Sequence, residues 1–423
     1  MMQDSDFEKL IQTGRPPNIV RCFPHSKALL VSGKVIDQAL TAKGGAMTIA
    51  ANGRNSLVIR GALRAAERAD ACLLIEIARS ECSYCPVNFF NIARMVDSFC
   101  NEMGITVPVA IHADHYGIKS EDDIPYAKME IPSLFDAGIT SIAVDASHMP
   151  DDKNLLANIA LAEYIPGWAG LETEVGEIKG TQGLSTVDDA TYLIKGLNSR
   201  GILPDWIALN NGSSHGLEAS GSGIQVELTA EIHRHLQDYG VSGAQHGTSG
   251  NNSDRLRAIG AQTNTTKANV ATALQMVSWG LEVNDYGNAI QDAEGNFVKK
   301  KGEGVSEATW EKMVRHAADA GWKGGDYKKL NLPFETTILA QERAVRERMV
   351  ARVEDFVYQM LTEVFHADGT ATLGKELLLA AGTYDLGSKG RQIEDPADWT
   401  VEKIIEKARH LDVDKGPEGD FDD

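Results

Sequence analysis

Eight short apolar runs, spaced by about 30 residues, constrain the fold of this chain more than any other feature. A loop is predicted at Tyr116-Gly117, and a helix that Asn55 caps is predicted to run to about Ala69. The other helices predicted between the runs cover residues 86–103, about 124–136, 155–164, a stretch that ends near 197, and 226–236. The run Cys72 to Ile77 is almost continuously apolar, which is typical of a parallel strand covered on both faces. The runs predict strands over residues 46–50, 72–77, 107–112, 138–144, 170–175, 206–209, 241–245 and 262–268.

Alternating strands and helices predict an α/β fold, and eight such units predict a (β/α)8 TIM barrel. A doubly wound open sheet is the alternative, but the G-x-G-x-x-G turn expected after its first strand is missing. Polar residues favour the barrel, because they stand at or just after predicted strand ends, which converge on one face of a barrel. These residues are Asn52, Asp114, His115, Asp145, Glu174, His215, His246 and Asn269.

The rest of the chain reads as additions to this barrel. We expect an N-terminal extension over residues 1–45, a catalytic barrel over 46–283, a polar insertion over 284–335 and a C-terminal helical segment over 336–423. The last segment ends in an acidic tail and begins with one long amphipathic helix, Thr336 to Leu361. We expect this helix to pack on the barrel, and an oligomer contact is the alternative.

Composition excludes several classes of function. The net charge of -19 repels nucleic acid and anionic membranes, so neither is an expected partner. Five cysteines, an odd number in a long chain, argue against a secreted disulfide framework. No run is long enough to cross a bilayer, and the N-terminus lacks a signal-peptide pattern. We therefore expect a cytoplasmic enzyme.

The segment His112-Ala113-Asp114-His115 carries the most informative chemistry. It places an acid beside an imidazole at the mouth of a strand, where a carboxylate can move a substrate proton and an imidazole can bind a metal. Histidines from two further strand ends, His215 and His246, complete a set that suits zinc with open coordination positions. We expect His112 and His148 to brace the site by hydrogen bonds.

At these positions the chain resembles the class II, metal-dependent fructose-bisphosphate aldolases. The matching segments follow the order and spacing of the family between about residues 46 and 280. They are 112–115, 140–148, 171–176, 215–216, 246–250 and 267–272.

The resemblance implies reversible aldol cleavage of a ketose bisphosphate. Fructose 1,6-bisphosphate is the expected substrate, with dihydroxyacetone phosphate and glyceraldehyde 3-phosphate as products. Asp114 would handle the proton of the C4 hydroxyl, and a zinc ion would polarise the substrate carbonyl. The zinc ligands would be His115, His215 and His246, with Asp145 and Glu174 at an alternative position or a second divalent ion.

The family also implies a phosphate site at a helix N-terminus, a monovalent cation (Na⁺ or K⁺) near Gly216 and Gly247, and a homo-oligomer, dimer or tetramer. The Ser that follows the second strand in the family corresponds to either Ala78 or Ser80. The substrate- and phosphate-binding residues implied are Asn52, Ser80, Gly180, Gly216, Gly247, Thr248, Ser249, Asn269 and Thr272.

Two departures from the family pattern leave alternatives open. Thr248 replaces a Gly, and its branched side chain restricts the backbone of the phosphate cradle. The loop 176–184 lacks the family's proton-moving Glu, a role that Glu177 could take. Otherwise another base acts, the substrate is tagatose bisphosphate or another phosphorylated ketose, or the chain is a non-catalytic aldolase-like subunit. Cys82 and Cys85 form a CxxC that we expect to hold reduced thiols rather than a regulatory disulfide.

Overall fold

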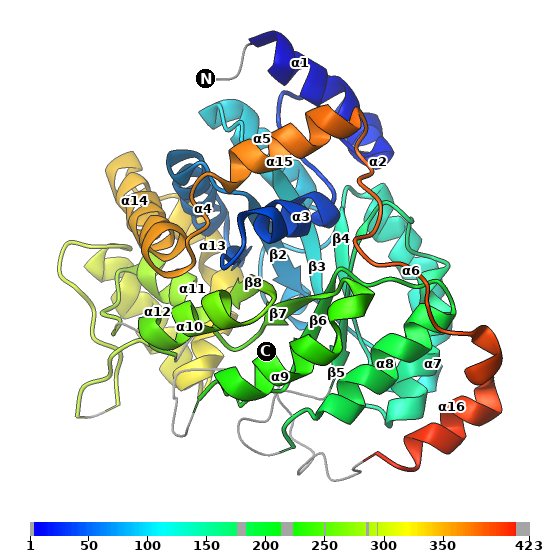
Figure 1. Ribbon diagram of the computed structural model, residues 1–423. Helices are drawn as coiled ribbons and strands as arrows, with labels where there is room; N and C mark the ends of the chain where they lie inside the picture. Colours follow the sequence, from blue (N-terminus) through cyan, green and yellow to red (C-terminus); the bar gives the residue numbers. More distant parts are fainter. Residues whose placement is uncertain are drawn as a thin grey trace.

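The computed structural model describes residues 4–175, 183–212, 223–248, 251–284, 287–293 and 295–411. Its centre is a closed barrel of parallel strands in sequence order, with β8 paired to β1 and helices around the outside (Figure 1). This confirms the predicted (β/α)8 TIM barrel. The strands are β1 (Thr48–Asn52), β2 (Leu73–Ala78), β3 (Val109–Gly117), β4 (Ser141–Asp145), β5 (Gly170–Val175), β6 (Trp206–Leu209), β7 (Ser242–Gln245) and β8 (Thr265–Val270).

Strand β3 is longer than the sequence predicts. The apolar pattern ends near His112, and a loop was expected at Tyr116, but the strand continues to Gly117. Its register against β4 shifts between Ala113 and Tyr116, and His115 lies in the left-handed region with φ of 42°. The shift is that of a β-bulge, which carries a strand past an irregular residue and re-aims a side chain.

A helix follows each strand, as the alternating pattern predicts. The expected cap at Asn55 is present, because its side chain accepts hydrogen bonds from the first turn of α4. The helix after β2 begins at Ile92 rather than at Pro86, because the amide oxygens of Asn88 and Asn91 bond nearby backbone N–H groups and hold a turn. The helices are α4 (Ser56–Ala69), α5 (Ile92–Met103), α6 (Ile124–Asp136), α7 (Asp151–Ala162), α8 (Val187–Ser199), α9 (Val226–His235), α10 (Ser253–Gln262) and α11 (Thr272–Trp279).

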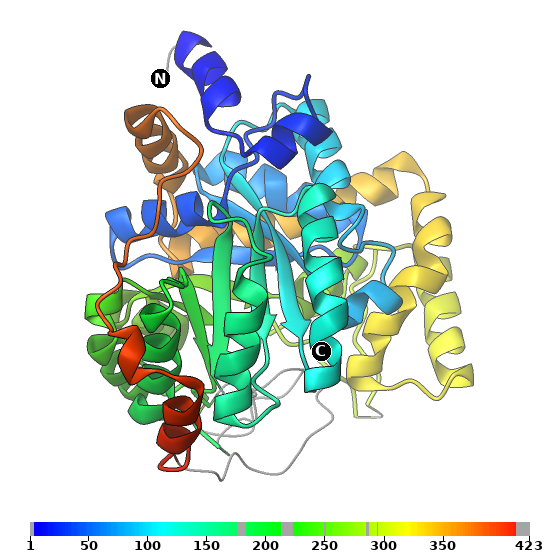
Figure 2. The same ribbon diagram turned by 90° about the vertical axis from the view of Figure 1, so that its right-hand side faces the viewer.

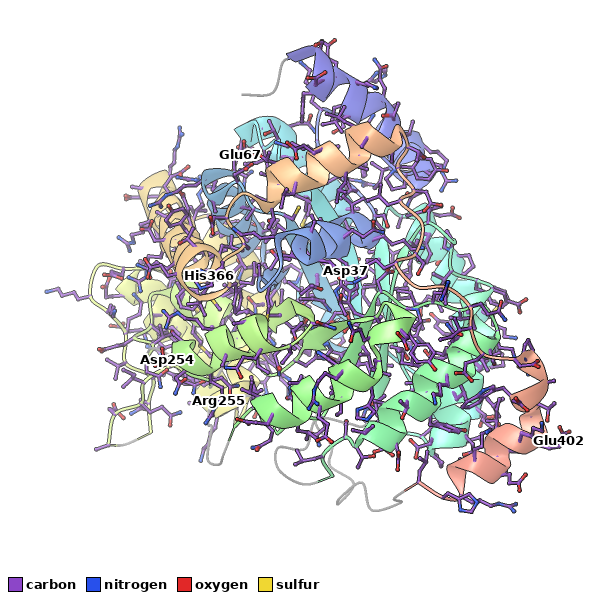
Figure 3. The ribbon with its side chains drawn as sticks, viewed as in Figure 1. Asp37, Glu67, Asp254, Arg255, His366 and Glu402 are labelled. Carbon is purple, nitrogen blue, oxygen red and sulfur yellow. The ribbon has the colours of Figure 1, made fainter. Side chains whose placement is uncertain are left out.

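Before the barrel, the chain forms α1 (Asp4–Thr13), α2 (Pro17–Cys22) and α3 (Gly33–Lys43). Helix α3 closes the N-terminal end of the barrel, and Asp37 marks its position in Figure 3. A Cβ on Gly33 would lie 2.6 Å from the Ser141 Oγ atom, so only glycine permits this approach. One end of the barrel is therefore sealed, which leaves the carboxyl ends of the strands for a site.

After the barrel, the predicted long helix from Thr336 to Leu361 is wrong. The chain forms α12 (Glu307–Asp319), then α13 (Asn331–Leu339) and, after a break, α14 (Arg343–Gln359). The residues at the break are ordinary helix formers, so no local pattern predicts it. The Gln341 side chain accepts a hydrogen bond from the Ser306 backbone N–H, and this tertiary contact holds the turn.

Two later helices, α15 (Thr370–Ala381) and α16 (Val401–Ala408), complete the described chain. Helix α15 packs against α1 and α3, so segments from the two ends of the chain lie side by side (Figures 1 and 2). Helix α14 packs along α4 on another side of the barrel. The boundaries predicted between the barrel and its additions stay a prediction. No helix in the described part of the chain is long and apolar enough to cross a membrane.

Candidate active site

Polar side chains fill the interior of the barrel in two stacked layers. Because alternate residues of a strand share a face, residues two apart on β3, β5 and β8 point into the barrel at successive heights. The upper layer, at the carboxyl ends of the strands, consists of Asp114, His115, Glu174, His246 and Asn269. The lower layer consists of Glu76, His112, Glu172 and Lys267, all without exposed surface.

Two imidazoles meet in the upper layer. The rings of His115 and His246 lie edge to face with centroids 4.4 Å apart. The Glu174 carboxylate lies beside both, with Oε1 3.1 Å from His115 Nδ1 and Oε2 3.9 Å from His246 Nδ1. Burial, and then the charge of Asp145, raise the pKa of Glu174. The potential ligand atoms of Asp114, His115 and His246 all lie within 4.8 Å of one another.

The tautomer of His246 follows from its contacts. Its Nε2 atom lies 2.8 Å from Glu172 Oε1, and an ionised carboxylate only accepts, so Nε2 carries the proton. Burial would raise the pKa of Glu172, but Lys267 and His246 outweigh it and lower this pKa to about 2. His246 Nδ1 is buried and has no hydrogen-bond partner among the described residues. A buried lone pair beside two carboxylates and a second imidazole fits a divalent metal ion.

Asp114 is buried but ionised. Burial alone would raise its pKa, but His115, Lys267 and His246 outweigh that effect and hold the pKa well below its usual range. The Asn269 side-chain amide donates to Asp114 Oδ1 at 2.9 Å, and Asp114 Oδ2 lies 3.8 Å from His115 Nε2. This carboxylate can therefore accept a proton at the mouth of the barrel.

Asp145, at the end of β4, is held at the edge of the same cluster. Its Oδ1 atom accepts hydrogen bonds from the backbone and hydroxyl of Ser147, and its Oδ2 atom lies 3.5 Å from His115 Nδ1. Burial opposes ionisation, but the bond and charge of His115 prevail and lower the pKa of Asp145. Asp145, His115 and Glu174 thus form a second set of ligand atoms within 4.8 Å of one another.

The lower layer surrounds the ammonium of Lys267. Its Nζ atom donates to Glu172 Oε2 at 2.7 Å and lies 3.0 Å from His112 Nε2. It also lies 3.5 Å from Asp114 Oδ1 and 3.6 Å from Glu76 Oε2. His112 therefore accepts at Nε2, and its Nδ1 lies 2.8 Å from the Ser141 hydroxyl. Burial and Lys267 lower the pKa of His112 to about 3, so the ring is neutral and braces the site, as expected.

The structure places the predicted substrate residues of the first two strands around a buried ion pair. The Asn52 side-chain amide donates to Glu81, which also binds the Arg54 guanidinium and the Ala78 backbone N–H. Ser80 begins the 3₁₀ turn that contains Glu81 and is partly exposed. Glu81 and Arg54 were not singled out from the sequence, because neither lies at a strand end.

Three other predicted phosphate residues lie at the ends of β7 and β8. Gly247 has φ of 58°, and its carbonyl accepts a hydrogen bond from the Asn251 side chain. Thr248 is buried and donates its hydroxyl to the Gln245 carbonyl, while Thr272 begins α11. Asn269 instead faces Asp114, inside β8. Predicted residues outside the described ranges are Glu177, Gly180, His215, Gly216 and Ser249.

Sequence reasoning missed the roles of Glu76, Glu172 and Lys267. A signal was present for Glu76, because it is the one charged residue in the otherwise apolar strand β2. Glu172 and Lys267 also stand two positions before the site residues Glu174 and Asn269, so parity alone places them on the inward face. The cysteines of the CxxC, Cys82 and Cys85, carry free thiols.

Comparison with known proteins yields one family and one fold. The family model described as class-II fructose-bisphosphate aldolase matches residues 34–321. A fructose-bisphosphate aldolase of Streptococcus pneumoniae is 28% identical over 249 residues, which are 56% of this chain and 78% of that protein. One of Staphylococcus aureus is 29% identical over 131 residues, or 31% of this chain and 42% of that protein.

Solved structures show the same fold at low identity. The YdjI aldolase from Escherichia coli K12 superposes with a TM-score of 0.54 at 17% identity, covering 81% of this chain and 99% of that one. The fructose-bisphosphate aldolase from Campylobacter jejuni superposes with a TM-score of 0.52 at 16% identity, covering 80% and 97%.

Proposed function

We propose, from the premise that the chain belongs to the class II fructose-bisphosphate aldolase family and is an aldolase, that it cleaves a ketose bisphosphate with the help of a divalent metal ion. Fructose 1,6-bisphosphate is the substrate that we propose. One observation carries the proposal: His115 and His246, from different strands, meet at 4.4 Å with the ionised Asp114 beside them. Histidines scattered through a core would not both face one carboxylate, as these two face Glu174, and would not leave a buried nitrogen such as His246 Nδ1 without a hydrogen-bond partner among the described residues.

The metal-binding residues that we propose are His115, His246 and Glu174, with Asp145 at the edge of the cluster and His215 as a further ligand outside the described residues. The unpartnered Nδ1 of His246 supports this choice. Zinc is the ion that fits a set of imidazoles with open positions, and when bound it supplies Lewis-acid polarisation of the substrate carbonyl.

Asp114 is the proton acceptor that we propose for cleavage. It takes the proton of the C4 hydroxyl, the bond between C3 and C4 breaks with its electron pair left on C3, and the aldehyde departs. Asn269 orients this carboxylate through Oδ1. C3 then gains a proton from a second acid, for which Glu177 stays our prediction.

The phosphate site that we propose uses the backbone of Gly247, the neighbouring Thr248 and Ser249, and the N-terminus of α11 at Thr272. This position, after the last two strands, is where barrel enzymes commonly bind phosphate. Glu81 occupies the mouth of β1 and β2 as a carboxylate paired with Arg54. We therefore place the phosphate at β7 and β8 rather than beside Asn52 and Ser80.

Chelation tests the proposal directly. We expect EDTA to abolish cleavage of fructose 1,6-bisphosphate and added zinc to restore it, measured by coupled detection of the triose products. Asp114→Asn should lower kcat by about 10²- to 10⁴-fold, the range for general acid–base catalysis, while zinc is still bound. The matched control is Asp136→Asn, because the side chain of Asp136 is 70% exposed on α6.

Two outcomes would contradict the proposal. Activity that resists chelation would remove the metal from the reaction. Faster cleavage of tagatose 1,6-bisphosphate than of its fructose epimer would reassign the substrate while keeping the reaction.

A further inference from the structure

The ammonium of Lys267 lies where a second metal ion would otherwise fit. The potential ligand atoms of Glu76, His112 and Asp114 lie within 4.8 Å of one another, and all three residues are buried. Lys267 Nζ lies 3.0 to 3.6 Å from each of these groups. Since its side chain has no exposed surface, this charge is a fixed part of the barrel interior.

One contact of Lys267 reaches the upper layer through a carboxylate. Glu172 binds the ammonium through Oε2 at 2.7 Å and His246 through Oε1 at 2.8 Å. The two oxygens of one rigid carboxylate thus face two partners, and turning Glu172 would break both bonds. Carboxylates that hold a metal-binding imidazole in this way commonly change metal affinity 10- to 100-fold when removed.

Glu76 provides an internal comparison. It faces the same ammonium, at 3.6 Å, but neither of its oxygens forms a hydrogen bond with a described residue. Among the described residues, Glu76 makes no direct hydrogen bond or ion pair with His246. Burial, and then the charge of Asp114, raise the pKa of Glu76 well above its usual range, so Glu76→Gln keeps a neutral group beside Lys267. Comparing it with Glu172→Gln therefore separates a change of side chain near Lys267 from a loss of the connection to His246.

We propose that Lys267 is a positioning residue: its ammonium locks Glu172 in the orientation that keeps the proton of His246 on Nε2 and leaves Nδ1 free for a metal ion. The inference deepens the proposed function and rests on it for the identity of the metal-binding residues. Lys267 also faces Asp114 Oδ1, so the same ammonium holds the proton acceptor in place.

The first experiment measures zinc affinity by competition with a fluorescent chelator. We expect Lys267→Ala to weaken zinc binding at least 10-fold, and n-propylammonium to restore part of the lost affinity by filling the cavity with a charge. The uncharged n-propanol should restore nothing. The control is Lys34→Met, which removes another buried lysine, one that bonds the Gly167 carbonyl at the sealed end of the barrel. Its zinc affinity should equal that of the unmodified protein.

A second pair of variants decides the matter if Lys267→Ala does not fold. Glu172→Gln should weaken zinc binding 10- to 100-fold, whereas Glu76→Gln should change it less than threefold. Equal effects of the two substitutions, no effect of either, or rescue of Lys267→Ala by propanol as well as by propylammonium would each overturn the proposal.

The proton position is read on the metal-free protein, so it does not depend on activity. Nitrogen NMR of ¹⁵N-histidine-labelled protein, assigned with His246→Asn, should show His246 protonated at Nε2, and Glu172→Gln should shift this signal towards a mixture of tautomers. If His246 is protonated at Nε2 as expected but the protein binds no zinc, the proposed function is contradicted and the positioning role of Lys267 is not. Zinc binding with His246 protonated at Nδ1 would do the reverse.

Discussion

At the scale of single residues, charged groups stand inside the barrel where such folds usually place Val, Ile and Leu. Asp205, just before β6, is the clearest case away from the candidate site. It is 1% exposed, and its Oδ2 atom accepts a hydrogen bond from the Leu171 backbone N–H. Burial, with Asp37 adding to it, raises the pKa of Asp205 to about 7 against the opposing charges of Lys34 and Lys389.

The raised pKa of Asp205 predicts how stability changes with pH. In the unfolded chain this carboxyl titrates near 3.8, so between about pH 4 and pH 7 the folded protein holds a proton that the unfolded chain releases. The stabilising contribution is present below that window and is lost as pH rises through it, by roughly 4 kcal/mol at most. Asp205→Asn removes the titration, so the variant should gain stability relative to the unmodified protein as pH rises from about 4 to 7, with little further change above pH 7.

Urea unfolding at several pH values checks this expectation. The difference in free energy of unfolding between Asp205→Asn and the unmodified protein should grow with pH, whereas the exposed control Asp136→Asn should show a constant difference. Parallel curves for Asp205→Asn would mean that the carboxyl is ionised in the folded protein throughout.

At the scale of elements, the sequence predicted what depends on short-range periodicity. Strands β5 and β6 match the predicted bounds, and α6 matches the helix predicted near residues 124–136, because apolar runs and caps are local signals. The bulge in β3 and the break between α13 and α14 were missed, because both are held by contacts with distant segments. Asp114 and His115 were found because they stand at a strand end, whereas Lys267 was not, because its role depends on residues from three other strands.

Helices α4 and α14 approach each other too closely for any side chain at Gly61. A Cβ atom there would lie 2.5 Å from the Val353 Cβ atom and 2.8 Å from the Val350 carbonyl oxygen. Helix propensity alone would make alanine more stabilising than glycine here, so the close packing decides whether the substitution raises or lowers the free energy of unfolding. We predict that Gly61→Ala destabilises the protein by about 1–3 kcal/mol, the usual cost of overpacking, measured by urea unfolding.

The reason for that loss is tested by a second substitution. Val353→Gly removes both side-chain atoms that the new methyl group meets, Cβ and Cγ1, so the double variant should be more stable than the sum of the two single effects. Gly325→Ala is the control, because a Cβ there meets no atom within 4 Å. Strict additivity would place the cost of Gly61→Ala elsewhere than at the contact between the helices.

At the scale of the whole molecule, the additions outside the barrel are bound to it by specific contacts. The segment after α15 follows α8 and β7: Asn198 Oδ1 accepts from the backbone N–H groups of Ile393 and Glu394, and Lys389 Nζ pairs with Asp37 of α3. Helix α16 then packs on α7 and α8, with Glu402 on its outer surface (Figure 3). These contacts connect the barrel wall to the helix that seals its N-terminal end.

Trp399 is the apolar anchor of this segment, and its removal tests how far the segment contributes to the fold. It is 4% exposed, its ring centroid lies 5.7 Å from that of Tyr192, and its indole N–H donates to Glu394. We predict that Trp399→Ala lowers the free energy of unfolding by about 3 kcal/mol or more, as buried Trp truncations do. Val401→Ala, two residues later and 48% exposed, should cost under about 0.5 kcal/mol.

Because the Trp399 contacts involve α8 and the segment after α15 but no residue of the upper layer, zinc affinity should stay the same in both variants. A Trp399→Ala protein as stable as the Val401 variant would show that the segment only covers the barrel, and one that loses zinc binding would show that it also shapes the site.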